Sequence, residues 1–267
     1  MLKENICALL ACLLLAACDM IDYHPYDVRV DGERDVNARN IELIEETCKG
    51  KTTLRFAVMG DSQRWYDETE DFVNALNKRD DVDFVIHGGD MSDFGVTDEF
   101  LWQRDIMNRL RVPYVALIGN HDCLGTGEDT YKAVFGPTNF SFIAGRVKFV
   151  CLNTNALEYD YSEPVPDFSF MEQQIKERRD EFDKSVICMH ARPETDVFNN
   201  NVSKVFGRYV REFPGIQFCT AAHTHTFRDD VIFDDGIHYF TTDCMKKRTY
   251  ILFTITPEGY DYELVKY

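Results

Sequence analysis

The chain has 267 residues, 45% of them hydrophobic and 28% charged, an ordinary globular composition that one large layered domain can accommodate. Its 46 acidic and 29 basic residues give a formal net charge of −17. This charge excludes non-specific binding of nucleic acid through phosphate contacts, although a small phosphorylated ligand could bind where metal ions reverse the local field.

The first 17 residues have the pattern of a secretory signal peptide. Lys3 precedes an apolar run from Ile6 to Ala17, which is too short to cross a bilayer comfortably. The sequence Leu15–Cys18 resembles the lipobox of bacterial lipoproteins, in which cleavage leaves a lipid-bearing cysteine; an ordinary signal with an incidental Cys18 is the alternative. We therefore expect lipidation at Cys18 and a chain anchored to a lipid membrane of the bacterial cell envelope.

Residues 18–50 are predicted to form a tether and an N-terminal helical segment. The stretch is polar and acidic, and Ile41, Leu43 and Ile44 have helical spacing. From residue 51 to residue 267 we expect a single domain.

Strand and helix patterns alternate in the first half of this domain. Apolar runs at Leu54–Met59, Phe84–Ile86 and Tyr114–Ile118 predict strands, and Asp67–Asn77 and Phe100–Leu110 have helical spacing. Strands alternating with helices at this rhythm indicate βαβ units and a parallel sheet.

Beyond residue 140 the predicted elements are richer in strands. Phe140–Ile143 and Val147–Asn153 indicate a hairpin, and helices are expected at Phe168–Phe182 and Val202–Phe213. The remaining predicted strands are Ser185–Met189, Ile216–Ala221, Val231–Phe233, His238–Thr241, Tyr250–Ile255 and Tyr260–Val265. Parallel units followed by such a tail predict two packed sheets with helices outside.

Five short polar islands each follow an apolar run. They are Gly60–Gln63, Gly89–Asp90, Gly119–Asp122, His190 and His223–His225. Ligand sites in open α/β sheets lie beyond the carboxyl ends of the strands, so we expect the islands to converge at one edge. Their oxygen and imidazole donors suit divalent metals such as Mn²⁺, Fe and Zn²⁺. Together they predict a two-metal hydrolytic centre.

The order and chemistry of these islands resemble the calcineurin-like metallophosphoesterase superfamily. Its pattern is D-x-H, G-D, G-N-H-D/E, an isolated H, and G-H-x-H, and the resemblance spans roughly residues 54–226. It implies an α/β fold: a four-layer α/β/β/α sandwich of two mixed sheets flanked by helices. It also implies a metal-dependent phosphoesterase that acts on phosphate mono- or diesters.

The resemblance assigns a role to each matching position. Two divalent metal ions (Mn, Fe or Zn) would be held by Asp61, Gln63, Asp90, Asn120, His190, His223 and His225. Asp90 would bridge both ions, which can activate a bridging hydroxide and clamp the transition-state oxygens. His121 would be catalytic without being a ligand, because in the family it faces the phosphate and stabilises or protonates the leaving group.

One departure from the family pattern keeps a second hypothesis open. Gln63 stands where a histidine would donate nitrogen to the first metal, and an amide oxygen is a poorer donor to borderline metals. The first site is therefore expected to be weaker or to favour a harder ion. The alternative function is a non-catalytic metal- or ligand-binding lipoprotein on the same fold.

Further candidates surround the predicted ligands. Asp93 and Asp122 lie inside the islands and are expected to orient imidazole rings, although Asp122 could equally cap the following segment. Arg64, Trp65 and Asn155 are candidate substrate contacts. The expected partner is a small phosphorylated substrate or a phosphoprotein.

Overall fold

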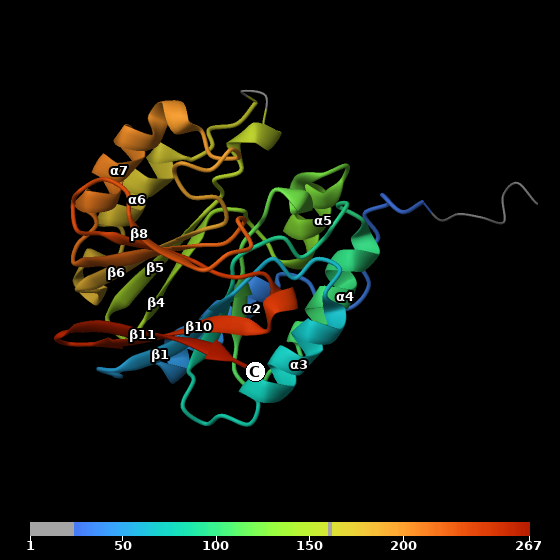
Figure 1. The fold of residues 1–267 in the computed structure, drawn as a ribbon, viewed down its shortest axis with the longest axis horizontal. Helices are drawn as coiled ribbons and strands as arrows, with labels where there is room; N and C mark the ends of the chain where they lie inside the picture. Colours follow the sequence, from blue (N-terminus) through green and yellow to red (C-terminus); the bar gives the residue numbers. More distant parts are fainter. Residues whose placement is uncertain (1–23, 160–161) are drawn as a thin grey trace, which may run out of the picture.

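The computed structural model describes residues 24–159 and 162–267, so the predicted signal peptide and Cys18 lie outside the described residues. Two β-sheets pack face to face, and helices cover their outer faces (Figure 1). The four-layer fold of two mixed sheets that the sequence predicts is confirmed.

The first sheet has five strands in the order β11-β10-β1-β2-β3. Their bounds are β1 Leu54–Met59, β2 Phe84–His87, β3 Tyr114–Ala116, β10 Thr249–Thr256 and β11 Gly259–Lys266. Strands β1, β2 and β3 are parallel, whereas β10 pairs antiparallel with both β1 and β11. The carboxyl ends of the three parallel strands therefore meet at one edge.

The second sheet has six strands in the order β4-β5-β6-β7-β9-β8. Their bounds are β4 Phe140–Ala144, β5 Val147–Leu152, β6 Lys184–Met189, β7 Ile216–Ala221, β8 Arg228–Val231 and β9 His238–Thr241. Strands β5, β6, β7 and β9 are parallel, and the two outer strands are antiparallel to their neighbours. The predicted hairpin of β4 and β5 is confirmed.

Of the six α-helices in the described residues, three cover the outer face of the first sheet, two cover that of the second, and one lies at the edge of the first sheet. The bounds are α2 Val36–Thr47, α3 Tyr66–Leu76, α4 Thr97–Met107, α5 Gly127–Val134, α6 Phe168–Lys176 and α7 Ser203–Glu212. Buried side chains of α3, α4 and α5 pack on the first sheet, and those of α6 and α7 pack on the second. The expected N-terminal helix is α2, whose Asn37 and Asn40 side chains donate to backbone oxygens of edge strand β3. In the part of the chain described, no helix combines the length and apolar character needed to cross a bilayer.

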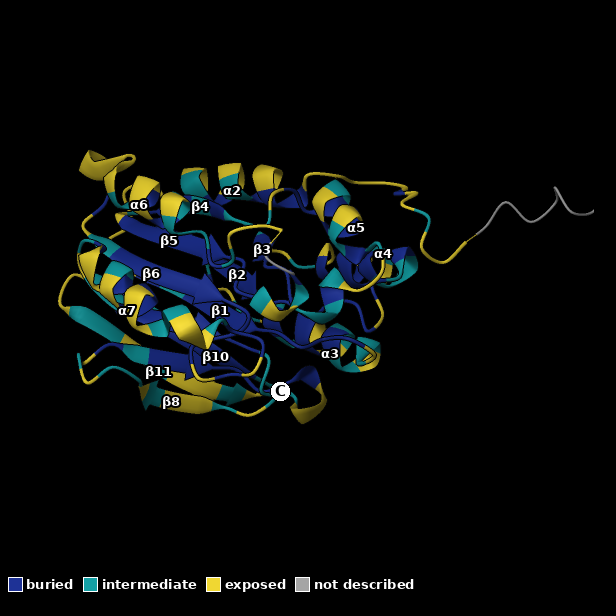
Figure 2. Ribbon diagram, turned by 90° about the horizontal axis from the view of Figure 1, so that it is seen from above, coloured by how far each residue is buried: buried dark blue, intermediate teal, exposed yellow. Residues whose placement is uncertain are grey.

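Aromatic side chains fill the space between the sheets. Phe56 stacks on Phe84 with ring centroids 5.0 Å apart, and Phe142 stacks on Phe149 at 4.9 Å. Phe84 meets Phe149 edge-on across the two layers, and Figure 2 shows the central strands of both sheets, among them β1, β5 and β6, as buried. Such aromatic pairs each contribute about 0.5–1.5 kcal/mol beyond their burial. The rigid double layer fixes where the strand ends, and thus the islands, lie.

Three predicted elements differ from the structure. The helix predicted at Phe100–Leu110 is Thr97–Met107. The helix predicted at Phe168–Phe182 ends at Lys176, because Glu177 is extended and Arg178 adopts a left-handed backbone conformation that a helix cannot continue. The strand predicted at Val231–Phe233 is instead Arg228–Val231. This edge strand is mostly exposed and polar, so its sequence does not carry the apolar pattern of a strand.

Candidate metal centre

The loops after β1 and β2 are bound together by their backbones. The Asp61 N–H donates to the Gly89 carbonyl at 3.0 Å, and the Ser62 and Gln63 N–H groups both donate to the Asp90 carbonyl at 3.0 Å. Asp61 and Asp90 each have a positive φ, 51° and 58°, a strained conformation that this network of loop contacts maintains. Both side chains are thereby buried beyond the carboxyl ends of the strands, close to one another.

Asp122 joins the β2 loop to the β3 loop. Its Oδ2 accepts the N–H groups of Asp90 at 2.9 Å and Gly119 at 2.8 Å. Its Oδ1 accepts those of Met91 at 2.9 Å and Ser92 at 2.8 Å. The buried carboxylate therefore holds backbone N–H groups, rather than the imidazole ring or the following helix that the sequence suggested.

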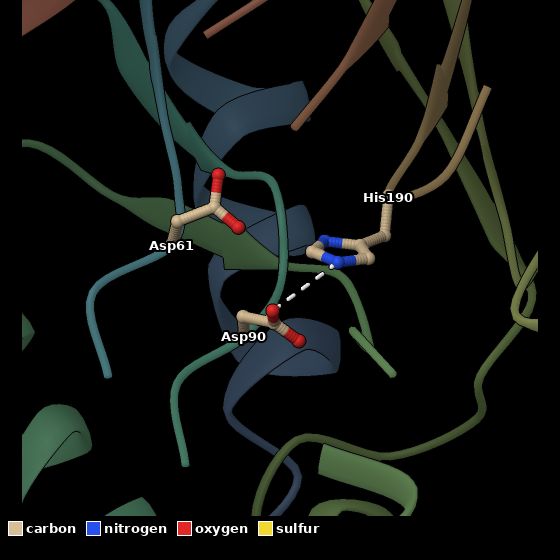
Figure 3. A group of neighbouring side chains, drawn as sticks. All are labelled: Asp61, Asp90 and His190. Atoms are coloured by element: carbon tan, nitrogen blue, oxygen red, sulfur yellow. Dashed lines mark ion pairs between the residues drawn. The ribbon is translucent and has the colours of Figure 1, made fainter. Parts of the chain in front are cut away.

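Three buried side chains form the centre of the site. Asp61, Asp90 and His190 come from the ends of β1, β2 and β6, and their ligand atoms all lie within 4.8 Å of one another (Figure 3). The His190 Nδ1 lies 2.8 Å from the Gly88 carbonyl, which makes Nδ1 the donor and leaves the lone pair on Nε2. That Nε2 lies 3.4 Å from Asp90 Oδ2.

Asn120 and His223 extend this cluster on one side. Asn120 Oδ1 lies 3.1 Å from His190 Nε2 and 3.0 Å from His223 Nδ1. The His223 backbone N–H also donates to both oxygens of Asp61, at 3.2 and 3.1 Å. Asn120, His190 and His223, the three residues assigned to the second metal alone, thus face one another, and Asp90 and Asp61 lie next to them.

Gln63 and His225 lie on the side of the first metal. Gln63 Nε2 is 3.3 Å from Asp90 Oδ2, while its Oε1 is buried and has no hydrogen-bond partner. His225 Nε2 lies 3.6 Å from Asp61 Oδ1 and remains partly exposed. A buried amide oxygen without a donor loses about 1–3 kcal/mol, which a cation at this position would offset.

The donor set fits divalent metal ions. Carboxylate, amide and imidazole acceptors converge on one another, and acceptors of this kind repel unless a proton or a cation lies between them. The structure places all seven predicted ligands together: Asp61, Gln63, Asp90, Asn120, His190, His223 and His225. There is no thiolate among them, in keeping with an oxygen- and imidazole-binding ion.

The pKa shifts of the central residues indicate that the buried carboxylates require positive charge beside them. Burial raises the pKa of Asp61 well above its usual range. Burial opposes the charging of His190, yet the Asp90 carboxylate outweighs it and raises the His190 pKa to about 9. For Asp90 the charge of His190 likewise overcomes burial and lowers the pKa. Without metal, a proton on His190 is the charge that the buried carboxylates favour.

The two histidines of the last island favour the neutral form. Burial lowers the pKa of both His223 and His225 below the usual value. A neutral imidazole is the form that binds metal. Their left-handed backbone, with φ of 72° and 56°, turns both rings towards the loops of the first sheet.

His121 lies beside the ligands without joining them. Its Nδ1 lies 2.9 Å from the Asp93 backbone carbonyl and 3.7 Å from the Asp93 carboxylate. The Asp93 carboxylate also forms an ion pair with Arg64. The Asp93 backbone carbonyl contacts this ring and its carboxylate links the ring to the Arg64 guanidinium, while an orienting role for the Asp93 side chain stays a prediction.

The other candidate substrate contacts differ in how far they are buried. Trp65 lies edge-on to His225, with ring centroids 5.6 Å apart, and forms part of the wall. Asn155 is fully buried and donates to the Ile118 carbonyl at 3.0 Å, while its Oδ1 has no partner. His87 lies behind the site, 2.8 Å from the Ser62 hydroxyl. A substrate contact through Asn155 stays a prediction.

Asp196 is a candidate functional residue that the sequence does not indicate. Asp196, in the loop between β6 and α7, lies 2.9 Å from His223 Nε2 on the side of the ring opposite Asn120. A carboxylate in this position fixes the tautomer of a metal-binding imidazole and raises its basicity. Asp196 also lines a cavity of about 370 Å³ together with Leu157, Glu163 and Asn199.

The chain matches a known protein family. Residues 54–227 match the family described as calcineurin-like phosphoesterase. No curated protein sequence is significantly similar to the chain.

Three solved structures share the fold. GAP50, the anchor in the inner membrane complex of Plasmodium, has a TM-score of 0.59 at 12% identity, over 81% of this chain and 85% of that one. Purple acid phosphatase PPD1 from yellow lupin (Lupinus luteus) seeds has a TM-score of 0.60 at 13% identity, over 81% and 52%. A dimetal phosphatase from Danio rerio has a TM-score of 0.59 at 12% identity, over 80% and 99%. At such low identity these matches show the fold alone.

Proposed function

Since the chain belongs to the calcineurin-like phosphoesterase family, we propose that it is a metal-dependent phosphoesterase that hydrolyses phosphate mono- or diesters. The observation that carries this proposal is the convergence of seven acceptor side chains, with Asp90 at the centre and the buried Gln63 Oε1 without a donor. The substrate is a small phosphorylated compound or a phosphoprotein.

The residues divide into two metal sites and a catalytic side chain. Asp61, Gln63 and His225 would hold the first of two divalent ions (Mn, Fe or Zn), Asn120, His190 and His223 the second, and Asp90 both. When bound, the two ions supply Lewis-acid activation of water and stabilise charge on the phosphoryl oxygens.

His121 is placed to manage charge on the leaving group. Its Nδ1 lies against the Asp93 carbonyl, so Nε2 is the ring nitrogen left to face a departing oxygen. Arg64, held by Asp93, brings a second positive charge to the same side of the site. The Arg64 guanidinium would attract an anionic phosphate ester to the site, although the protein as a whole is negatively charged.

Turnover of p-nitrophenyl phosphate and its bis ester with added Mn²⁺ tests the proposal. Asp90→Ala should abolish metal-dependent turnover, and His121→Ala should lower it by about 10²–10⁴-fold, the usual contribution of a general acid. His238→Ala is the matched control, because His238 begins β9 at the opposite end of the sheet. If neither ester and no member of a nucleotide panel is hydrolysed in a metal-dependent way, the proposed phosphoesterase activity is refuted.

A non-catalytic metal- or ligand-binding lipoprotein is the second candidate. Gln63 favours it, because an amide replaces the expected imidazole, and GAP50, described as an anchor, shows that the fold occurs in a protein named for another role. This candidate predicts metal binding without turnover. The same assay, with metal content measured in parallel, separates the two.

We also propose that Cys18 carries the lipid anchor that holds the protein in the bacterial cell envelope. The support is the Leu15–Cys18 sequence after an apolar signal-like run. Metabolic labelling with a fatty acid should disappear in Cys18→Ala. Labelling that persists in the variant would overturn the assignment.

A further inference from the structure

Large apolar side chains are exposed on three segments next to the metal centre. Phe94 in the loop after β2 is 59% exposed, Leu124 in the loop after β3 is 38% exposed, and Tyr26 in the first described segment is 38% exposed. We call these three residues the rim. Neighbouring exposed apolar side chains indicate a contact surface more strongly than isolated ones do.

The three segments of the rim touch one another. A Cβ atom on Gly95 would lie 1.8 Å from the Leu124 carbonyl oxygen, and one on Gly125 would lie 2.5 Å from the Tyr26 ring. The Thr126 hydroxyl also donates to the Tyr26 carbonyl at 2.7 Å. The segments that carry the rim residues therefore lie against one another on this side of the domain.

The rim borders the catalytic side of the site. Phe94 directly follows Asp93, whose carbonyl accepts from His121, and the Leu124 N–H donates to the His121 carbonyl at 3.3 Å. A surface that contacts the rim would therefore lie next to the segment that carries His121.

The proposed anchor attaches to the chain close to this surface. Figure 1 shows the first described residues beside α4 and α5, the helices that follow the loops of Phe94 and Leu124. Seven residues lie between Cys18 and Tyr26, so eight residue-to-residue steps join them. Fully extended they would span at most about 28 Å, whereas a domain of this length is roughly 45 Å across. A lipid on Cys18 therefore keeps the rim side of the domain nearer to the membrane than the opposite side.

We propose that the rim contacts the lipid bilayer that holds the Cys18 acyl chains, so that the metal centre opens at the membrane surface and takes phosphate esters carried by membrane lipids. The rim contact rests on the proposed anchor, and the substrate class rests also on the proposed function. The net charge of −17 favours a zwitterionic bilayer over an anionic one.

Fluorescence quenching tests the contact without any need for activity. The full lipidated chain carrying Phe94→Trp is reconstituted in phosphatidylcholine vesicles with brominated acyl chains. Leu264→Trp, at a 45% exposed position on β11, is the matched control, and the unsubstituted chain corrects for the native Trp65 and Trp102. The added fluorescence at position 94 should be quenched at least twice as strongly as that at position 264.

Equal quenching at the two positions would overturn the rim contact. Fatty-acid labelling of the same preparation reports the anchor separately, and a chain without acyl groups would overturn the proposal through its premise.

Turnover on vesicles tests the substrate class. Phosphatidic acid in phosphatidylcholine vesicles is compared with soluble p-nitrophenyl phosphate, using the Phe94→Ser and Leu124→Ser variants and the control Leu264→Ser. The ratio of vesicle to soluble turnover should fall about tenfold in the rim variants and stay constant in the control. An equal ratio in all variants would refute membrane-borne substrates, whereas loss of both activities in the unsubstituted chain would refute the phosphoesterase itself.

Discussion

The substitution Asp122→Asn removes a charge that contacts neither metal nor substrate in the proposed mechanism. Asp122 accepts four backbone N–H groups with its two oxygens, two at each. An asparagine keeps one of these oxygens and places an NH₂ group where the other was. That NH₂ group would face two N–H donors and could accept from neither.

The expected destabilisation follows from the two lost bonds. A hydrogen bond to a charged group contributes about 1.5–3 kcal/mol, so two of them contribute about 3–6 kcal/mol. The Asp122 side chain is fully buried, so water cannot replace them. In a domain of this size each kcal/mol lowers Tm by about 2–4 °C, which predicts a fall of about 6 °C or more.

Thermal and urea unfolding of the metal-free protein at pH 8 measure the effect. At this pH the carboxyl is ionised, because burial and then the charge of Asp90 raise the pKa of Asp122 only to about 7. The raised pKa also means that the buried charge itself costs stability, so the loss is expected at the lower end of the range. Asp129→Asn is the matched control, since Asp129 is exposed in the first turn of α5 and should shift stability by less than about 1 kcal/mol. A difference between the two variants below about 1 kcal/mol would show that Asp122 does not hold the loops together.

Three further predictions follow from the same contacts. Because the pKa of His190 is raised to about 9, the folded metal-free chain keeps a proton that the unfolded chain loses above about pH 6.5, so its free energy of unfolding should fall as pH rises from about 6.5 to 9. Calorimetry in buffers of different ionisation enthalpy should show proton release on metal binding, and no release would contradict the raised pKa. Asp196→Asn should weaken one of two metal-binding steps about tenfold or more in a chelator competition titration, and unchanged affinity would remove its positioning role. Gly95→Ala should destabilise the fold by roughly 2 kcal/mol more than Gly50→Ala, because both have a positive φ but only the first would meet a backbone oxygen; equal chemical-denaturation midpoints would contradict this.

The parallel strands and their islands could be predicted because each carries a local signal. An apolar run ends in Gly-Asp or Gly-Asn-His, and the geometry of a parallel sheet then brings Asp61, Asp90 and Asn120 to the same edge. The end of α6 and the position of β8 could not be predicted in this way. Arg178 ends its helix through a backbone conformation that many residues disfavour, and β8 is a polar edge strand whose place depends on pairing with β9.

The supporting residues of the site were harder to predict than its ligands. Asp196 belongs to no island, and its contact with His223 joins two loops 27 residues apart in sequence. Asp122 lies inside an island, but the sequence cannot show that its partners are backbone N–H groups from the preceding loop. Such contacts depend on how loops fold against one another, which local composition does not determine.

The metal content of the purified mature protein tests the central claim most directly. The unsubstituted chain should hold two divalent ions per molecule by elemental analysis, because seven acceptor side chains converge around Asp90. Asp90→Ala should hold fewer, since both ions would lose a shared carboxylate. One ion or none in the unsubstituted chain, under metal-replete conditions, would contradict the bridging role of Asp90 and with it the two-metal centre.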